Sequence, residues 1–135
     1  KSLQPFDLDV CEPIKPPWHI ADKGFNVLDD GLGQDWYGFV WCNPPYGGQT
    51  HRWISRMMKH NNGIALVFAR TDTETFQDFC FSADAILFIK GRLKFYTVDG
   101  IQGNDAGAPS CLLAWGDEAV KRLEQSGIRG KLIYP

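Results

Sequence analysis

The spacing of apolar and polar residues changes several times along the chain, and each change predicts a new element. Residues 6–10 alternate apolar and acidic side chains, as a half-exposed strand does. Short and nearly unbroken apolar runs are typical of strands that are covered on both faces. The sequence has four such runs: Gly38–Cys42, Ile64–Ala69, Ala85–Ile89, which Gly91–Phe95 extends, and Ser110–Trp115.

Helical spacing appears between these runs. Residues 50–60 carry Trp53, Ile54, Met57 and Met58 on one face, and Asn61-Asn62-Gly63 is a stop signal. The stretch Thr71-Asp72-Thr73-Glu74 fits a capping box before a short helix that buries Phe76 and Phe79. A third helix is predicted from a cap at Asp117 to about Ser126.

Two segments lack a regular pattern. Residues 11–35 are rich in Pro, Gly and Asp and predict a long loop, and residues 100–107 predict a second, glycine-rich loop. Strands that alternate with helices predict an α/β fold with a mainly parallel sheet. The last two long strands are joined without a helix, so we expect them to pair antiparallel. In such sheets ligands bind at the carboxyl ends of the strands.

Composition fits one ordinary globular domain over residues 1–135. Hydrophobic residues make up 44% and charged residues 22% of the 135 positions. No apolar run approaches the roughly 20 residues of a membrane span, and there is no signal-peptide pattern. The four cysteines form no C-x-x-C pair and the three histidines are scattered, so we expect reduced thiols, no metal and a cytoplasmic location.

Charge is unevenly distributed along the sequence. The net charge is −2, with −4 in residues 1–50 and +2 in residues 51–135, which is no strong nucleic-acid signal. Two local basic groups remain candidates for DNA contact: Arg92 with Lys94, and Arg52, Arg56 and Lys59 on the predicted helix. A solvated strand face explains Arg92 and Lys94 equally well.

The stretch Asn43-Pro44-Pro45-Tyr46 follows an apolar strand directly. Each proline fixes its own φ, lacks an N–H and restricts the residue before it, so the segment is a stiff bracket. It offers the Asn43 side-chain oxygen and two backbone carbonyls as acceptors, and Tyr46 adds a flat ring. The matching ligand is a planar group with an NH₂, such as the exocyclic amine of adenine.

NPPY after an apolar strand is similar to the catalytic motif of S-adenosylmethionine-dependent amino-group methyltransferases. Further segments over residues 6–115 resemble, in order and spacing, the phage-type (Dam-like) DNA N-6-adenine methyltransferases. These segments are Leu8-Asp9-Val10, Asp29-Asp30-Gly31-Leu32, Gln34-Asp35-Trp36, Val40–Gly47, Ala69-Arg70-Thr71-Asp72-Thr73 and Gly91-Arg92-Leu93-Lys94-Phe95.

The resemblance implies a Rossmann-like class I methyltransferase fold with helices on both faces, S-adenosylmethionine as cofactor and DNA as partner. Family members carry a further segment before the first strand, so it also implies that the N-terminal segment here is short. Implied catalytic residues are Asn43, Pro44, Pro45 and Tyr46. Implied cofactor contacts are Asp9, Val10, Cys11, Asp35 and Asn43, and implied contacts to the base or DNA are Tyr46, Arg92, Lys94 and Phe95.

Two alternatives stay open at this point. The same motif serves methyltransferases that modify RNA bases or glutamine side chains. A relative of the fold that binds DNA or another partner without catalysis is the second alternative. The sequence predicts neither the target DNA sequence nor the oligomeric state.

Overall fold

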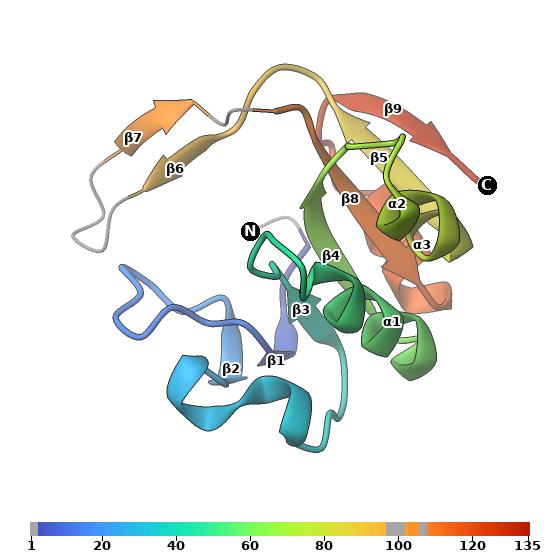
Figure 1. The fold of residues 1–135 in the computed structure, drawn as a ribbon. Helices are drawn as coiled ribbons and strands as arrows, with labels where there is room; N and C mark the ends of the chain where they lie inside the picture. The colour runs from blue at the N-terminus through green and yellow to red at the C-terminus, as the bar shows by residue number, and fades with distance from the viewer. Residues whose placement is uncertain (1–2, 97–101, 106–107) are drawn as a thin grey trace.

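The computed structural model describes residues 3–96, 102–105 and 108–135. Its main feature is a seven-stranded sheet with helices on both sides (Figure 1). The sheet strands are β1 (Phe6–Asp9), β2 (Ala21–Gly24), β3 (Val40–Cys42), β4 (Gly63–Phe68), β5 (Ala85–Ile89), β8 (Ser110–Trp115) and β9 (Gly130–Ile133). The α-helices are α1 (Thr50–His60), α2 (Glu74–Asp78) and α3 (Asp117–Glu124).

The strand order is β2-β1-β3-β4-β8-β5-β9. The pairs among β2, β1, β3 and β4 are parallel, whereas β4–β8, β8–β5 and β5–β9 are antiparallel. The α/β class and the antiparallel pairing of the last two long strands are therefore confirmed, but the sheet is mixed rather than mainly parallel in its pairing. The reason is that β8 returns between β4 and β5 and separates two strands that run in the same direction.

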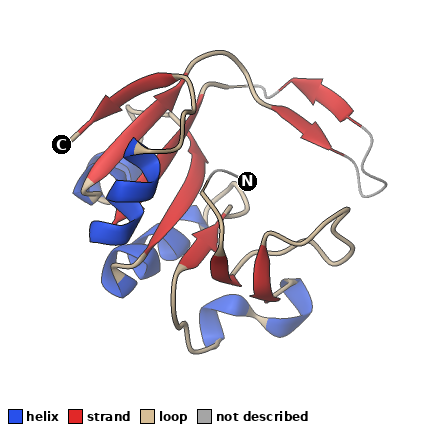
Figure 2. Ribbon diagram, turned by 180° about the vertical axis from the view of Figure 1, so that it is seen from behind, coloured by secondary structure: helices blue, strands red, loops and turns tan. Residues whose placement is uncertain are grey.

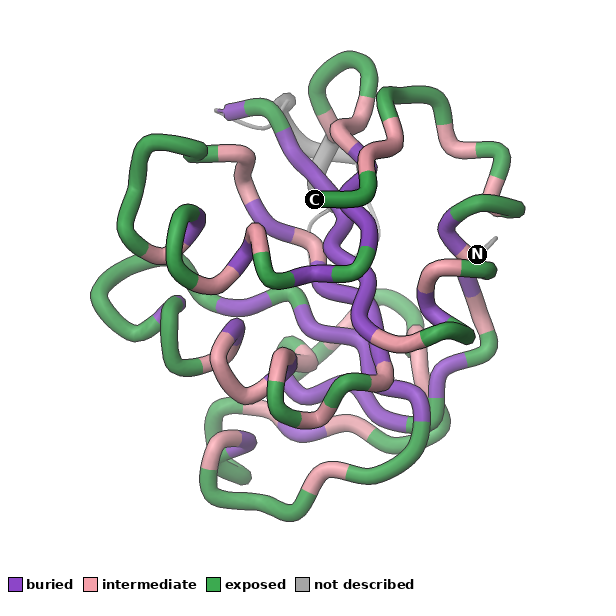
Figure 3. Tube along the Cα trace, turned by 90° about the vertical axis from the view of Figure 1, so that its right-hand side faces the viewer, coloured by how far each residue is buried: buried purple, intermediate pink, exposed green. Residues whose placement is uncertain are grey.

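Two apolar layers hold the helices to the sheet. One layer joins Ile54 and Met57 of α1 and Phe76 of α2 to inward-facing residues of β1, β3 and β4. The other joins Ala119 and Leu123 of α3 to the opposite face. Figure 3 shows the buried residues concentrated along the central strands, between exposed outer turns.

Helix α1 has the predicted limits, and its C-terminal end carries a clear local signal. Asn61 takes the left-handed conformation (φ 54°) that ends many helices, and its N–H donates to the Met57 carbonyl. The caps of the other two helices lie one or two residues away from the predicted caps. Thr73, not Thr71, caps α2 by accepting from the Phe76 N–H, and Gly116 precedes α3, which ends at Glu124.

Residues 11–35 contain more regular structure than predicted. They include β2 and two 3₁₀ turns, Val27–Asp29 and Gly31–Gly33. The first turn begins with a capping box, in which Asn26 accepts from the Leu28 N–H and Asp29 accepts from the Asn26 N–H. Strand β2 was missed because its sequence, Ala-Asp-Lys-Gly, has no apolar alternation. It is an edge strand that is held to the sheet by backbone pairing.

The chain after β5 leaves the main sheet instead of extending it. Gly91 has φ 82°, and β6 (Lys94–Tyr96) pairs with β7 (Gln102–Asp105) in a separate two-stranded ribbon. Figures 1 and 2 show this ribbon projecting away from the seven-stranded sheet. Residues 102–105 of the predicted glycine-rich loop are thus a strand, while residues 100, 101, 106 and 107 lie outside the described residues.

Candidate active site

The carboxyl ends of β1, β3 and β4 lie at one edge of the sheet, because these strands are parallel neighbours. The predicted bracket, residues 43–46, follows β3 there, and the turn at residues 10–13 follows β1. The two segments that the sequence singled out are therefore adjacent.

The first proline of the bracket ends the pairing of β3 with β4. The Val40 N–H donates to the Asn62 carbonyl (3.1 Å), and the register pairs Cys42 with Ala65. Continued by two residues, this parallel ladder would require an N–H from Pro44, which proline lacks. Strand β3 stops at Cys42 while β4 continues to Phe68.

The bracket leaves two acceptors unused. The Pro45 carbonyl accepts from the Thr50 hydroxyl (2.7 Å), which ties the bracket to the start of α1. Among the described residues, no hydrogen bond reaches the Asn43 side chain or the Pro44 carbonyl. The Pro45 carbonyl is therefore hydrogen-bonded within the protein. The Pro44 carbonyl remains available beside the exposed Asn43 amide.

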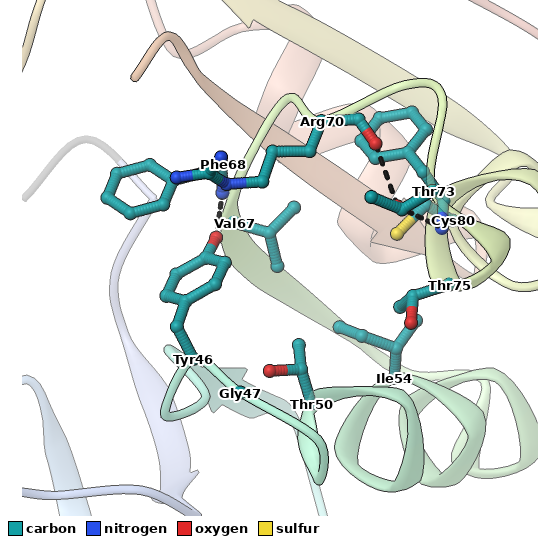
Figure 4. Close-up of a pocket in the computed structure, with 11 residues that line it drawn as sticks. Tyr46, Gly47, Thr50, Ile54, Val67, Phe68, Arg70, Thr73, Thr75 and Cys80 are labelled. Carbon is teal, nitrogen blue, oxygen red and sulfur yellow. Dashed lines mark hydrogen bonds between the residues drawn. The ribbon is translucent and has the colours of Figure 1, made fainter. Parts of the chain in front are cut away.

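Tyr46 folds back onto the end of β4. Its ring stacks on Phe68 with centroids 4.3 Å apart and planes 24° apart, and the Phe68 N–H donates to the Tyr46 hydroxyl. The Arg70 guanidinium lies 5.6 Å from the centre of the Phe68 ring. Figure 4 shows Tyr46 pointing at Phe68 and the Arg70 side chain extending toward the same ring. Burial raises the pKa of the Tyr46 hydroxyl, so the group stays protonated at neutral pH.

A cavity of about 410 Å³ lies between the turn and the bracket. One wall contains Val10, Cys11 and Glu12, and the bracket contributes Asn43 and Pro45. The opposite wall comes from Asn26, Asp30 and Gly31 with Trp53 of α1. A second cavity of about 210 Å³ shares Cys11, Glu12 and Asn43 and is also lined by Asp9.

The wall at residues 30–34 is fixed to α1. The Arg56 guanidinium donates to the Leu32 and Gln34 carbonyls, both at 2.8 Å, and lies 4.7 Å from the centre of the Trp36 ring. The Trp36 indole N–H donates to the Gly31 carbonyl (2.8 Å). Arg56 is thereby committed to the protein's own backbone, which weakens the alternative that it contacts DNA.

Asp9 is the one acidic side chain at this edge that is almost fully buried, with 3% of its surface exposed, among the residues that the structure describes. Burial raises its pKa to about 7; the nearby Glu12 adds to the increase, while the hydrogen bond from the Cys11 N–H (3.1 Å) opposes it. Glu12 itself pairs with His19 (2.9 Å). Asp9 therefore titrates near neutral pH.

Asp35 does not join this group. It is exposed and is absent from the residues that line both cavities, whereas Asp30, five residues earlier, lines the larger one. Sequence reasoning also missed Asn26 and Trp53 as lining residues. The Asp29-Asp30-Gly31 segment was a signal for this wall, but the folding of residues 26–33 into two turns could not be read from composition.

A third cavity of about 210 Å³ separates the bracket from the end of β4. It is lined by Leu66, Val67, Phe68 and Ser110 together with the four bracket residues, Asn43, Pro44, Pro45 and Tyr46. Beyond Tyr46 and Phe68 lies a fourth cavity of about 360 Å³ that reaches α1 and α2 and includes Arg70 (Figure 4). The early end of β3 thus opens space directly beside the two unused acceptors.

The predicted basic strip lies after β5. Arg92 is exposed and precedes β6, while Lys94 and Phe95 are part of that strand. The side chains of Lys94 and Phe95 lie outside the described residues. In the described part of the chain, no group of three or more His, Cys, Asp or Glu side chains could hold a metal ion, and the four cysteines are free thiols.

Together, the α/β fold and the acceptor bracket at the edge of the sheet are consistent with the amino-group methyltransferase class. The chain belongs to the DNA N-6-adenine-methyltransferase (Dam) family, whose sequence model matches residues 1–123. The protein is therefore a DNA adenine methyltransferase, and the family uses S-adenosylmethionine to methylate N6 of adenine in DNA. This membership decides between the acceptors that the motif left open.

Neither the curated proteins nor the solved structures contained a match to the chain. In the residues described, no helix is long and apolar enough to cross a bilayer.

The titration of Asp9 yields a testable prediction about stability. In the folded state Asp9 holds its proton up to about pH 7, whereas in the unfolded chain it loses the proton near its ordinary pKa of 3.8. Between these values the folded state binds more protons, so the free energy of unfolding falls as pH rises, by up to about 4 kcal/mol, and then levels off. Asp9→Asn keeps an acceptor for the Cys11 N–H and removes this loss.

Urea denaturation of the parent and of Asp9→Asn from pH 4 to pH 8 tests the prediction. We expect the free energy of unfolding of the variant to increase relative to that of the parent as pH rises through this range. Above pH 7 the variant should be the more stable protein. Asp22→Asn, an exposed substitution on β2, is the matched control and keeps the parent's pH dependence. Parallel curves for the parent and Asp9→Asn would contradict the assignment.

Proposed function

We propose that the 410 Å³ cavity and its 210 Å³ neighbour bind S-adenosylmethionine and that the target adenine enters the third cavity, between the bracket and β4. One observation supports this most directly: Asn43, one of the two unused acceptors, lines all three cavities, and Pro44, which carries the other, lines the third. A ligand on the β1 side and a base on the β4 side would face each other at these atoms.

The charges of the cavity walls fit the cofactor. The two cavities on the β1 side are lined by Asp9, Glu12 and Asp30 and, among the described residues, by no lysine or arginine. S-adenosylmethionine carries a sulfonium and an ammonium against one carboxylate, so it has a net positive charge that these carboxyls complement. When bound, it supplies a methyl group that the positive sulfur already activates.

Asn43 and Pro44 orient the amine and stabilise its developing charge. The lone pair of the adenine amine is delocalised into the ring, and two acceptors on its hydrogens favour a pyramidal nitrogen with a free lone pair. The prolines hold the acceptors in place before the substrate arrives, so little reorganisation accompanies the reaction. The burial of Pro44 and the hydrogen bond from the Thr50 hydroxyl to the Pro45 carbonyl keep the bracket stiff.

Tyr46 provides a stacking surface for the base. One face of its ring is covered by Phe68, and the residue is 45% exposed. The target base must leave the duplex to reach the bracket, and stacking on an aromatic ring is worth roughly 1–3 kcal/mol per base. We propose that the face of Tyr46 turned away from Phe68 receives the adenine.

We further propose that the segment before and within β6 contacts the DNA backbone. Arg92 and Lys94 follow β5, whose carboxyl end lies at the same edge as the bracket. The slightly acidic chain cannot rely on global attraction to DNA, so local cations must contribute most of it.

Replacing the side-chain acceptor tests the catalytic assignment. Asn43→Ala should lower the rate of tritium-methyl transfer to unmethylated duplex DNA at least about a hundredfold, because no other group replaces the lost oxygen. Asn43→Asp should keep part of the activity, since a carboxylate also accepts from an amine. Calorimetric titration with S-adenosylmethionine should show that both variants remain folded and bind cofactor. Methyl transfer by Asn43→Ala at the parent's rate would exclude the role.

The cofactor cavity is tested by a pair of aspartates. Asp30 lines the cavity and Asp35 does not, so Asp30→Ala should raise the Kd for S-adenosylmethionine about tenfold while Asp35→Ala changes it less than about twofold. Calorimetry of the two variants beside the parent measures both values. Equal effects, or a larger effect at Asp35, would place the cofactor elsewhere.

The DNA contact is tested by its dependence on salt. Replacing Arg92 and Lys94 together with alanine should weaken binding about equally for all DNA sequences and reduce the salt slope by roughly one unit per lost phosphate contact. Filter binding across a salt series measures this, with Lys59→Ala on α1 as the comparison. An unchanged slope in the double variant would mean that these residues are only a solvated strand face.

A further inference from the structure

The Tyr46 hydroxyl occupies the hydrogen bond that would otherwise close the bracket onto β4. In a parallel ladder, a hydrogen-bonded residue donates its N–H to the residue that precedes its partner on the next strand. Its carbonyl then accepts from the N–H of the residue that follows the same partner. Val40 obeys this rule, since it is paired with Gly63 and donates to Asn62. The same register carried forward pairs residue 44 with Val67.

The Pro44 carbonyl would then accept from the Phe68 N–H. Proline at 44 removes the donating half of that pair, but its carbonyl could still accept, and Phe68 still carries an N–H. In the structure this N–H donates to the Tyr46 hydroxyl instead. Figure 4 shows the bond between the two residues. The 210 Å³ cavity between the bracket and β4 occupies the place where the ladder would have continued.

We propose that Tyr46 has a second role, in which its hydroxyl holds the Phe68 N–H away from the Pro44 carbonyl and so keeps that carbonyl free for the adenine amine. Tyr46 is in this respect a positioning residue for Pro44, independently of the stacking by its ring. Phe68 assists, because its ring packs on that of Tyr46 and fixes the hydroxyl over its own N–H. The inference rests on the proposed function, since it assumes that the Pro44 carbonyl binds the substrate amine.

The chemistry of each partner suits this role. The Tyr46 hydroxyl stays neutral because burial raises its pKa, so it accepts the Phe68 N–H and keeps its own proton for another acceptor or water. A free backbone N–H at the end of a strand is rarely left without a partner. Without the hydroxyl, the nearest acceptor along the ladder is the Pro44 carbonyl.

Tyr46→Phe separates the hydroxyl from the ring. The variant keeps an aromatic face and the contact with Phe68, so stacking of the target base should persist. We expect kcat to fall about tenfold, because the substrate amine must displace a competing hydrogen bond at Pro44. The Kd for S-adenosylmethionine should be unchanged. Tyr37→Phe is the matched control: Tyr37 is half-exposed and makes no hydrogen bond among the described residues, so this variant should keep the parent's kcat.

A direct readout needs no activity. In protein labelled with ¹⁵N and ¹³C, a scalar coupling across the hydrogen bond between the Phe68 nitrogen and the Pro44 carbonyl carbon should be absent from the parent and present in Tyr46→Phe. Fluorescence of DNA that carries 2-aminopurine at the target position, measured with both proteins, reports whether the base is still flipped and stacked. We expect the same fluorescence with both.

Removing the competing donor should rescue the variant. Placing phenyllactic acid at position 68 replaces the Phe68 N–H by an ester oxygen and leaves the side chain intact. In the Tyr46→Phe background this change should restore kcat toward the parent's value, and the coupling to Pro44 should vanish. A structural defect of Tyr46→Phe would not be repaired by an ester.

The outcomes are decisive in both directions. A tenfold fall in kcat with the new coupling and rescue by the ester supports the proposal. A parent-like kcat, a fall without the coupling, or a coupling without a fall overturns it. Full activity of Asn43→Ala would instead refute the proposed function, and it would leave the coupling measurement, which reads only the protein, unaffected.

Discussion

The missing N–H of Pro44 is the constraint on which the rest of this site depends. It stops β3 at Cys42, whose partner is Ala65, while β4 continues for three more residues to Phe68, and the strands separate there. The separation leaves a cavity between the bracket and β4 and an acceptor, the Pro44 carbonyl, without a partner in the described chain. Unpaired acceptors beside the interior of a protein cost stability, and here the binding of a substrate amine would offset that cost.

The remainder of the fold holds the bracket and its unpaired acceptor in place. Thr50 bonds the Pro45 carbonyl from the first turn of α1, and Ile54 and Met57 bury that helix against the sheet. The opposite wall of the 410 Å³ cavity, which we propose as the cofactor site, is fixed to the same helix through Arg56. Helix α1 therefore holds both the bracket and the far wall, so displacement of either relative to the other requires breaking its packing on β3 and β4.

The sequence predicted those parts of the structure that local rules determine. The limits of α1 followed from helical spacing and the Asn61 stop, and β5 and β8 followed from apolar runs with clear breaks. The sequence-based prediction was wrong where the structure of a segment depends on which strand it pairs with. Strand β2 has no apolar alternation and exists because β1 offers it an open edge. The segment after β5 leaves the sheet because the paired stretches of β8 and β9 end beside Phe88 and Ile89 and Gly91, with φ 82°, turns the chain.

The same distinction explains the candidate site. Asn43, Pro44 and Tyr46 were predicted because the functional groups are contiguous and the prolines dictate their own geometry. Asp30 and Asp35 are equally acidic and lie in equally plausible loops, and only the two 3₁₀ turns that precede Gln34 put the first at the cavity and the second in solvent. The pairing of the Phe68 N–H with the Tyr46 hydroxyl could not be predicted from composition either, since it depends on where a neighbouring ladder stops. Residues that shape an active site through backbone pairing are thus the ones that sequence patterns alone do not reveal.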